Sequence, residues 1–306
     1  MTTPLIAADL HNHSTASDGE YTPAELVSRA QELGIKTIGL TDHDSIAGLD
    51  EFVEAGRKKG IQVVTGVEVS LRFSRSYFTG SLHLLLYFST AFLGNSEFKN
   101  DITHILSKGR GIALVTDRVD AINREFGPQG RTQLLKKDLT VVEITSLADN
   151  VTRRHFFKAL SQNHGIDDKK QIDMLIGNSS PAYIPSGIDM GLLTPLFEKY
   201  HVVKVLAHPA AGSFPDDSHY KEVLPPVEIV EKIMPEFLDP DIMGIDGLEV
   251  YYPGHTDEYE KAMLQLCRRY NLIATGGSDC HDKEIRPLGI KGISHHDLDR
   301  LINKIG

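Results

Sequence analysis

The chain has 306 residues, a formal net charge of −10 and a pI near 5.8. This length is enough for one large α/β domain with an insertion. The acidic balance excludes broad binding of duplex DNA, which needs a positive surface. It does not exclude a phosphorylated substrate, because bound divalent cations can reverse the local charge of a site.

Two further features of the composition concern compartment and membrane. The sequence has no apolar run of 18 residues, so we expect no membrane partner. It has only two cysteines, Cys267 and Cys280, too few for a framework of disulfide bonds. This low number fits a reducing compartment. We therefore expect a cytoplasmic protein.

The first ninety residues alternate short apolar runs with helical patterns. Thr22 reads as a helix N-cap, with Pro23 at the first helical position and Glu25 closing a capping box, and this helix should end near Gly34. A second helix is expected from Ser45 to Gly60. Strands are expected over 5–10, 37–40, 62–67 and 82–88. Strand–helix–strand units of this length predict parallel strands joined by right-handed crossovers.

The pattern changes near residue 95 and becomes mostly helical until about residue 195. Helices are expected within this stretch over 103–108, 117–126, 154–162 and 169–176. Strand-like runs then return over 202–207, 248–252 and 272–275. The chain is therefore predicted to form an α/β barrel, at residues 1–95 and 196–306, that is interrupted by a helical insertion at residues 96–195.

Polar residues cluster where the predicted strands end. They are Asp9, His11, His13 and Asp18 after the first strand, Asp42, His43 and Asp44 after the second, Glu68 after the third, His83 in the fourth, and later His208, Asp279 and His281. The carboxyl ends of parallel strands meet at one face of a barrel, so these side chains should converge. Imidazole and carboxylate ligands suit Zn²⁺, Mn²⁺ or iron and are typical of hydrolytic centres.

Each cluster also has an ordinary structural explanation. One His-x-His pair is a weak signal, the TDHD segment could cap a helix, and His208 before Pro209 could be a core histidine. Glu68 is harder to explain in this way, because a carboxylate within an apolar run needs a charged or metal partner. Five clusters at matching strand ends together favour a metal centre.

The motifs DLHNHSTASDG, LTDHDSIAGL, GVEVS, AHP and GGSDCH, in this order and spacing, resemble the PHP (polymerase and histidinol phosphatase) family. The resemblance covers residues 5–90 and 200–290. It implies a distorted (β/α)7 barrel with a trinuclear metal site, and a helical insertion domain that covers the active site. One ion would be held by His11, His13, Glu68 and Asp279, a second by Glu68, His83 and His208, and a third by Asp18, His43 and His281.

Within the family, the chain looks most like stand-alone phosphoesterases that act on nucleotides. An arginine–x–histidine–phenylalanine motif of that branch resembles residues 153–156, which implies that Arg153 and His155 contact substrate phosphate. Arg153 could instead lie on a solvated helix face. His255, in a segment that also resembles the family, or a water held by Asp44, is expected to protonate the leaving group. Cys280 stands where many relatives have an aromatic residue.

The resemblance therefore implies a metal-dependent hydrolase of a phosphomonoester, with a nucleoside 3′,5′-bisphosphate as the expected substrate. The hypothesis is attack by a metal-bridging hydroxide, with two or three divalent ions drawn from Mn²⁺, Fe²⁺/Fe³⁺ and Zn²⁺, and Mg²⁺ as an alternative. One alternative is a 5′–3′ exonuclease acting on short single-stranded RNA or DNA, and histidinol phosphate is a third substrate candidate. Alternatives of another class are an amidohydrolase and a non-catalytic PHP docking module.

Overall fold

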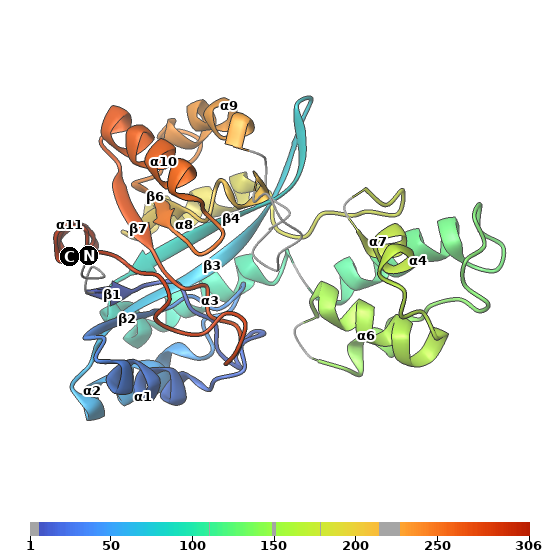
Figure 1. Ribbon diagram of the computed structural model, residues 1–306, viewed down its shortest axis with the longest axis horizontal. Helices are drawn as coiled ribbons and strands as arrows, with labels where there is room; N and C mark the ends of the chain where they lie inside the picture. The colour runs from blue at the N-terminus through green and yellow to red at the C-terminus, as the bar shows by residue number, and fades with distance from the viewer. Residues whose placement is uncertain (1–5, 110, 149–150, 178, 214–226) are drawn as a thin grey trace. The chain divides into compact units, whose positions relative to one another are not determined.

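The computed structural model describes residues 6–109, 111–148, 151–177, 179–213 and 227–306 (Figure 1). It divides into two compact units: a barrel unit, Met1–Leu106 with Asp189–Gly306, and a helical unit, Ser107–Ile188. The sequence placed these boundaries at residues 95 and 196. The difference arises because Phe98 is fully buried and packs with Phe88 and Tyr200, at ring-centroid distances of 5.0 Å each, which ties its helix to the barrel unit.

The barrel unit is built on one seven-stranded sheet whose strands follow each other in chain order. The strands are β1 (Ala8–Asp9), β2 (Thr37–Leu40), β3 (Gln62–Arg75), β4 (Phe78–Phe88), β5 (Val203–Leu206), β6 (Gly247–Tyr251) and β7 (Ile273–Gly276). The backbone N–H of Leu10 donates to the carbonyl of Gly276 at 3.2 Å, which joins the first strand to the last. The sheet is thus a nearly closed barrel, which confirms the predicted α/β barrel class.

The direction of β4 corrects the expectation of parallel strands. β4 runs antiparallel to both β3 and β5, whereas the other neighbouring pairs are parallel. β3 is also longer than expected, and it turns directly into β4 at Ser76 and Tyr77, so the two strands form a long hairpin that projects from the sheet in Figure 1. Glu68 consequently lies inside β3 and does not follow a strand end, whereas His83 lies inside β4, as expected.

Helices of the barrel unit cover the sheet. They are α1 (Pro23–Leu33), α2 (Leu49–Lys59), α3 (Ser96–Leu106), α8 (Thr194–Lys199), α9 (Val227–Leu238), α10 (Asp257–Tyr270) and α11 (His295–Ile305), with 3-10 turns at Thr90–Gly94, Met190–Leu193 and Ala211–Ser213. The α1 capping box is confirmed: Thr22 accepts from the Glu25 N–H, and the Glu25 carboxylate accepts from the Thr22 N–H.

The predicted start of the second helix at Ser45 is wrong. α2 begins at Leu49, because the preceding segment is bound to β3: the Asp44 N–H donates to the Glu68 carbonyl at 2.9 Å. Asp44 also has a φ of 46°, a left-handed conformation that no helix interior contains. Residues 45–48, which were expected to be helical, therefore form a loop that follows the contact between Asp44 and β3.

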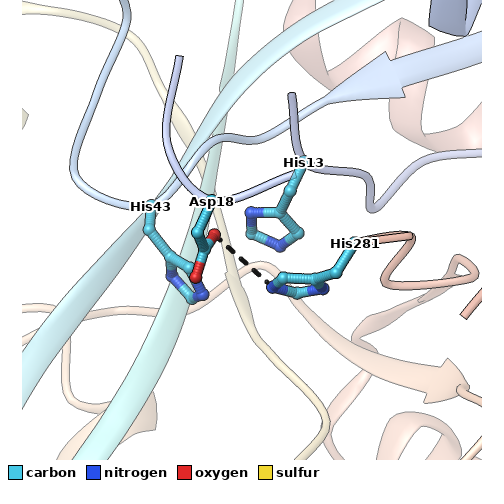
Figure 2. A group of neighbouring side chains, drawn as sticks. All are labelled: His13, Asp18, His43 and His281. Carbon is cyan, nitrogen blue, oxygen red and sulfur yellow. Dashed lines mark ion pairs between the residues drawn. The ribbon is translucent and has the colours of Figure 1, made fainter. Parts of the chain in front are cut away.

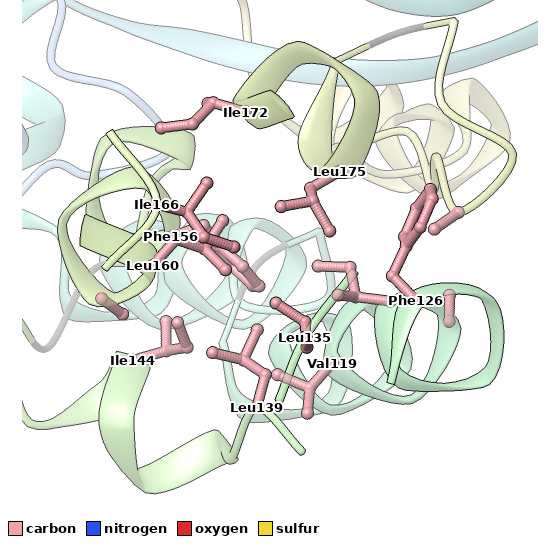
Figure 3. Close-up of a cluster of buried hydrophobic side chains, with 14 of the residues drawn as sticks. Val119, Phe126, Leu135, Leu139, Ile144, Phe156, Leu160, Ile166, Ile172 and Leu175 are labelled. Atoms are coloured by element: carbon pink, nitrogen blue, oxygen red, sulfur yellow. The ribbon is translucent and has the colours of Figure 1, made fainter. Parts of the chain in front are cut away.

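The helical unit has its own hydrophobic core (Figure 3). Its helices are α4 (Ile112–Phe126), α5 (Val141–Thr145), α6 (Arg153–His164) and α7 (Lys169–Ile176). Phe126, Ile144, Phe156, Leu160 and Leu175 are almost fully buried within it. Among the described residues of either unit, no helix is long and apolar enough to cross a membrane.

Candidate metal centre

Four side chains from three segments form a fully buried cluster at the end of the barrel, which we call the buried group: His11, His13, Glu68 and Asp279. The Nε2 atoms of His11 and His13 lie 3.2 Å apart. They lie 3.3 and 3.2 Å from Glu68 Oε2, and 3.4 and 3.0 Å from Asp279 Oδ1. Two nitrogens and two oxygens thus face one common point, and they are the four residues predicted to hold one ion.

The two oxygens of Glu68 face different histidines. Oε2 faces the buried group and also lies 3.0 Å from His43 Nδ1. Oε1 lies 2.8 Å from His83 Nδ1 and 3.0 Å from His208 Nε2, which come from β4 and from the end of β5. Glu68 therefore stands between two sets of imidazole nitrogens, in the arrangement of a carboxylate that bridges neighbouring ions.

A second cluster, the open group, contains His13, Asp18, His43 and His281, whose side chains point toward one another in Figure 2. His281 Nε2 lies 3.6 Å from Asp18 Oδ1, and the His13 and His281 rings stack at 4.1 Å. The Asp18 and His281 side chains are 21% and 19% exposed, so this cluster faces solvent while the buried group does not. The structure thus brings all nine predicted ligands together.

The backbone is strained where it presents these residues. Five described non-glycine residues have positive φ, and three of them belong to the site: Asp44 (46°), His208 (25°) and Asp279 (50°). Such conformations cost about 1–3 kcal/mol each and persist where surrounding structure holds them. Gly277 allows the last loop to approach β1, because a Cβ there would lie 2.3 Å from the His11 backbone nitrogen.

The sequence analysis missed three residues that bind the buried group from outside. They contact His11 and Asp279 at the side-chain atoms that face away from the other members of the group. The second oxygen of Asp279, Oδ2, accepts from the Tyr252 hydroxyl at 3.1 Å and from Arg286 Nη1 at 2.6 Å. The Glu249 carboxylate accepts from His11 Nδ1 at 2.9 Å. Glu249 gave the same signal as Glu68, an acid inside an apolar strand, whereas Tyr252 and Arg286 carried no signal of their own.

The charges of the two groups differ with their surroundings. Burial would lower the pKa of His13, but the adjacent carboxylates of Asp279 and Glu68, 3.0 and 3.2 Å from its Nε2, outweigh burial and raise the pKa to about 10. Burial lowers the pKa of His43 to about 4. Burial would also raise the pKa of Glu68, but His43 and His83 hold that pKa well below its usual value. The cluster thus concentrates negative charge on Glu68 between histidines that titrate differently.

The residues present fit divalent metal ions. Glu68 Oε2 and Asp279 Oδ1 are buried and make no hydrogen bond to any described residue. Buried polar atoms without such a bond are costly, and a bound cation would satisfy both. Ligand atoms at about 2.0–2.2 Å from a tetrahedral ion stand roughly 3.3–3.6 Å apart. The separations within the buried group, from 3.0 to 3.4 Å, are close to that spacing.

The residues predicted to act on substrate make mainly structural contacts. Asp44 Oδ1 accepts from the Ser70 N–H at 2.8 Å. His255 is buried, with its Nδ1 2.8 Å from the Val250 carbonyl and its Nε2 accepting from the Ala210 N–H at 3.2 Å. Both ring nitrogens are used, and burial lowers the pKa of His255 to about 4, which favours a structural role over proton donation.

In the helical unit, Arg153 begins α6 and its guanidinium lies over the Tyr183 ring at 5.9 Å. His155 Nδ1 accepts from the Thr152 N–H at 2.9 Å, which caps the same helix. Cys280, in the barrel unit, is fully buried and its thiol donates to the Asp282 carbonyl at 3.6 Å, so it lies outside the clusters of ligand atoms.

Comparison with known proteins identifies the family. The family model described as PHP domain matches residues 9–184, which is more than half of the chain. The chain belongs to the PHP domain family. A putative metal-dependent phosphoesterase from Bifidobacterium adolescentis has the same fold, with a TM-score of 0.70, 23% sequence identity, and coverage of 98% of this chain and 97% of that one.

Three curated relatives of this PHP protein have names that describe cleavage of phosphate esters. Over 294 residues it is 26% identical to a 5′–3′ exoribonuclease of Haemophilus influenzae, covering 89% of each chain. Over 284 residues it is 29% identical to a phosphoribosyl 1,2-cyclic phosphate 1,2-diphosphodiesterase of Eggerthella lenta, covering 90% of this chain and 94% of the relative. Over 67 residues, 22% of this chain and 24% of the relative, it is 45% identical to a 3′,5′-nucleoside bisphosphate phosphatase of Chromobacterium violaceum. The protein is a metal-dependent phosphoesterase.

Proposed function

We propose that this PHP protein hydrolyses a phosphomonoester of a nucleotide, with a nucleoside 3′,5′-bisphosphate as substrate. The observation that carries the proposal is the division of the Glu68 carboxylate, with Oε2 toward the buried group and Oε1 toward His83 and His208. If two cations were bound, Glu68 would be a ligand to both, and paired cations would neutralise the charge of a phosphoryl group. The 45% identity to the bisphosphate phosphatase supports the choice of substrate, over the short region that it covers.

The chain's own residues prepare the site in stated ways. The nine predicted ligands, His11, His13, Asp18, His43, Glu68, His83, His208, Asp279 and His281, would hold two or three divalent ions. Such ions supply a water-derived nucleophile at neutral pH and neutralise charge on phosphoryl oxygens. Tyr252 and Arg286 fix the rotation of the Asp279 carboxylate by binding its Oδ2, so that Oδ1 faces His11 and His13.

Mn²⁺, iron and Zn²⁺ remain the expected ions, since the donor set is imidazole and carboxylate without thiolate. Both cysteines are free thiols, which supports the expected cytoplasmic location.

The prediction for Arg153 is kept as part of the proposal. An arginine contacts phosphate through charge-assisted hydrogen bonds, which contribute about 1.5–3 kcal/mol each. Its exposed neighbour on the same helix, Arg154, provides a matched control. We expect Arg153→Ala to raise KM for the bisphosphate by roughly 10- to 100-fold, and Arg154→Ala to change it less than threefold.

The experiment is phosphate release in the presence of Mn²⁺ from a nucleoside 3′,5′-bisphosphate, a 5′-mononucleotide, histidinol phosphate and a short 5′-phosphorylated RNA. Turnover of the bisphosphate at least tenfold above the mononucleotide supports the proposal. No release from any phosphomonoester by the metal-loaded protein contradicts it.

One other activity has a specific observation in its favour. The exoribonuclease relative matches over 89% of both chains, whereas the bisphosphate phosphatase matches over a short region. A 5′–3′ exonuclease on short single-stranded RNA would use the same centre. Shortening of the RNA from its 5′ end, with little bisphosphate turnover, would favour this second candidate.

A further inference from the structure

Glu249 is a buried carboxylate in the middle of β6, and none of the predicted ligand sets includes it. A buried carboxylate is costly unless donors surround it. Among the described residues, its ion pair is with His11, whose Nδ1 lies 2.9 Å from Oε1 and 3.1 Å from Oε2. Oε2 also accepts from the backbone N–H of His208 at 2.8 Å. Glu249 thus contacts two predicted ligand residues at once.

The first contact sets the tautomer of His11. A carboxylate oxygen accepts hydrogen bonds, so the Nδ1 atom of His11 is assigned as the donor of this pair. In a neutral ring the lone pair then belongs to Nε2. That atom is the one that faces Glu68 Oε2, Asp279 Oδ1 and His13 Nε2, at 3.2–3.4 Å. The proton is therefore kept on the side of the ring away from the ligand atoms.

The second contact stabilises an unfavourable backbone conformation at His208. His208 has a φ of 25°, and its Nε2 lies 3.0 Å from Glu68 Oε1. The hydrogen bond from its N–H to Glu249 fixes the peptide that this conformation requires. The His11 and His208 rings are stacked, with centroids 5.5 Å apart. One carboxylate therefore supports histidines that face the two different oxygens of Glu68.

We propose that Glu249 is a positioning residue of the metal centre, which fixes the Nε2 lone pair of His11 toward the buried group and holds His208 in its left-handed conformation. His11, His208 and Glu249 offer ligand atoms within 4.8 Å of one another, but both Glu249 oxygens accept from N–H donors, which favours a role outside the ligand shell. The inference rests on the proposed metal centre but is independent of the substrate.

Glu249→Gln is the sharpest test, because it keeps the size of the side chain and removes one acceptor. Glutamine has one carbonyl oxygen for two donors, so either His11 Nδ1–H or the His208 N–H must face its NH₂ group. Loss of such an outer partner typically weakens metal affinity by about 10- to 100-fold. Glu249→Asp keeps two acceptors on a shorter side chain and should lose less. Glu260→Gln, which removes an acid on α10 that pairs with Lys291, is the matched control.

The primary measurement is Zn²⁺ affinity by competition with a chelator, with circular dichroism and thermal unfolding to check folding. The second is ¹H–¹⁵N spectroscopy of the Zn²⁺-loaded protein, in which the His11 Nδ1–H and the His208 amide are observed directly. We expect Glu249→Gln to weaken Zn²⁺ binding 10- to 100-fold, and either to shift the Nδ1–H signal or to speed exchange of the His208 amide. Glu260→Gln should leave the Zn²⁺ affinity, the His11 Nδ1–H signal and the exchange rate of the His208 amide unchanged.

Two results would overturn the inference. One is unchanged affinity and unchanged spectra in folded Glu249→Gln. The other is the loss of one whole Zn²⁺ equivalent with both N–H signals intact, which would make Glu249 a ligand. A wild-type protein that binds Zn²⁺ as expected but hydrolyses no phosphate ester would contradict the proposed function and leave this inference standing.

Discussion

The buried group and the open group share His13 but differ in what surrounds them. In the buried group, two of the three partners of His13 are held from outside: His11 by Glu249, and Asp279 by Tyr252 and Arg286. In the open group, Asp18 and His281 are partly exposed and lie 3.6 Å apart. Ligands that are already oriented lose less freedom when an ion binds. We therefore expect the buried group to bind its ion tightly and the open group to exchange its ion readily.

The largest effect should follow from substitutions of Glu68, which faces both sets of histidines. Glu68→Ala should lower kcat/KM by at least about 10³-fold, as for loss of a group that stabilises developing charge, and should reduce the bound metal by more than one equivalent. The measurement is turnover together with metal content by elemental analysis. Glu68→Gln should rescue little, because its NH₂ group cannot replace an oxygen ligand. Retention of full metal content in Glu68→Ala would contradict the shared role of this carboxylate.

Substitution in the open group should have a smaller and more selective effect. We expect Asp18→Ala to lower kcat about 10²-fold, to remove one metal equivalent, and to leave the tightly bound metal in place. Glu20→Gln, which removes an exposed acid two residues away, is the control and should behave as wild type. Loss of all metal in Asp18→Ala would erase the distinction between the two groups.

Proton competition offers a third test. The raised pKa of His13, about 10, means that the metal-free protein keeps this proton through neutral pH. An ion must displace it, so metal affinity should rise with pH from 6.5 to 8.5, by about tenfold per pH unit for each proton released. Calorimetry in buffers of different ionisation enthalpy counts the released protons. A metal affinity that is independent of pH would contradict the displacement of a proton from His13 by the ion.

The smallest effect on turnover should come from His255. Removing its ring in His255→Ala leaves the Val250 carbonyl and the Ala210 N–H without their buried partner, which should lower the free energy of unfolding by about 2–4 kcal/mol. Activity per folded molecule should change less than threefold, with the same pH profile. The measurements are denaturant unfolding and the pH dependence of kcat. A lost acidic or basic limb in that profile would restore the predicted role of His255 in proton transfer.

Local signals in the sequence predicted much of the fold. The capping box at Thr22 and Glu25 is complete within four residues, so it specified the start of α1 without knowledge of the rest. The direction of β4 could not be found in this way, because strand direction depends on which neighbours pair, and those pairings join residues far apart. The start of α2 was missed for the same reason, since β3 holds Asp44 in a loop.

The residues of the candidate site also divide into those that local motifs reveal and those that only long-range contacts reveal. The nine predicted ligands come from short motifs of histidines and acids that resemble the PHP family, and the structure brings these residues together. The partners behind them were not found, since a tyrosine such as Tyr252 or an arginine such as Arg286 is ordinary in any loop. Their meaning depends on Asp279, and only the folded chain brings them to its Oδ2 atom.

The closure of the barrel has a consequence for how the protein matures as it is made. His11 leaves the ribosome before Asp279, which is 268 residues further along the chain, yet the Asp279 N–H donates to the His11 carbonyl at 2.8 Å. A nascent chain therefore carries most of its ligands for much of its synthesis without the segment that closes the buried group. The four side chains of the buried group can therefore surround an ion only after the segment that carries Asp279 has joined β1.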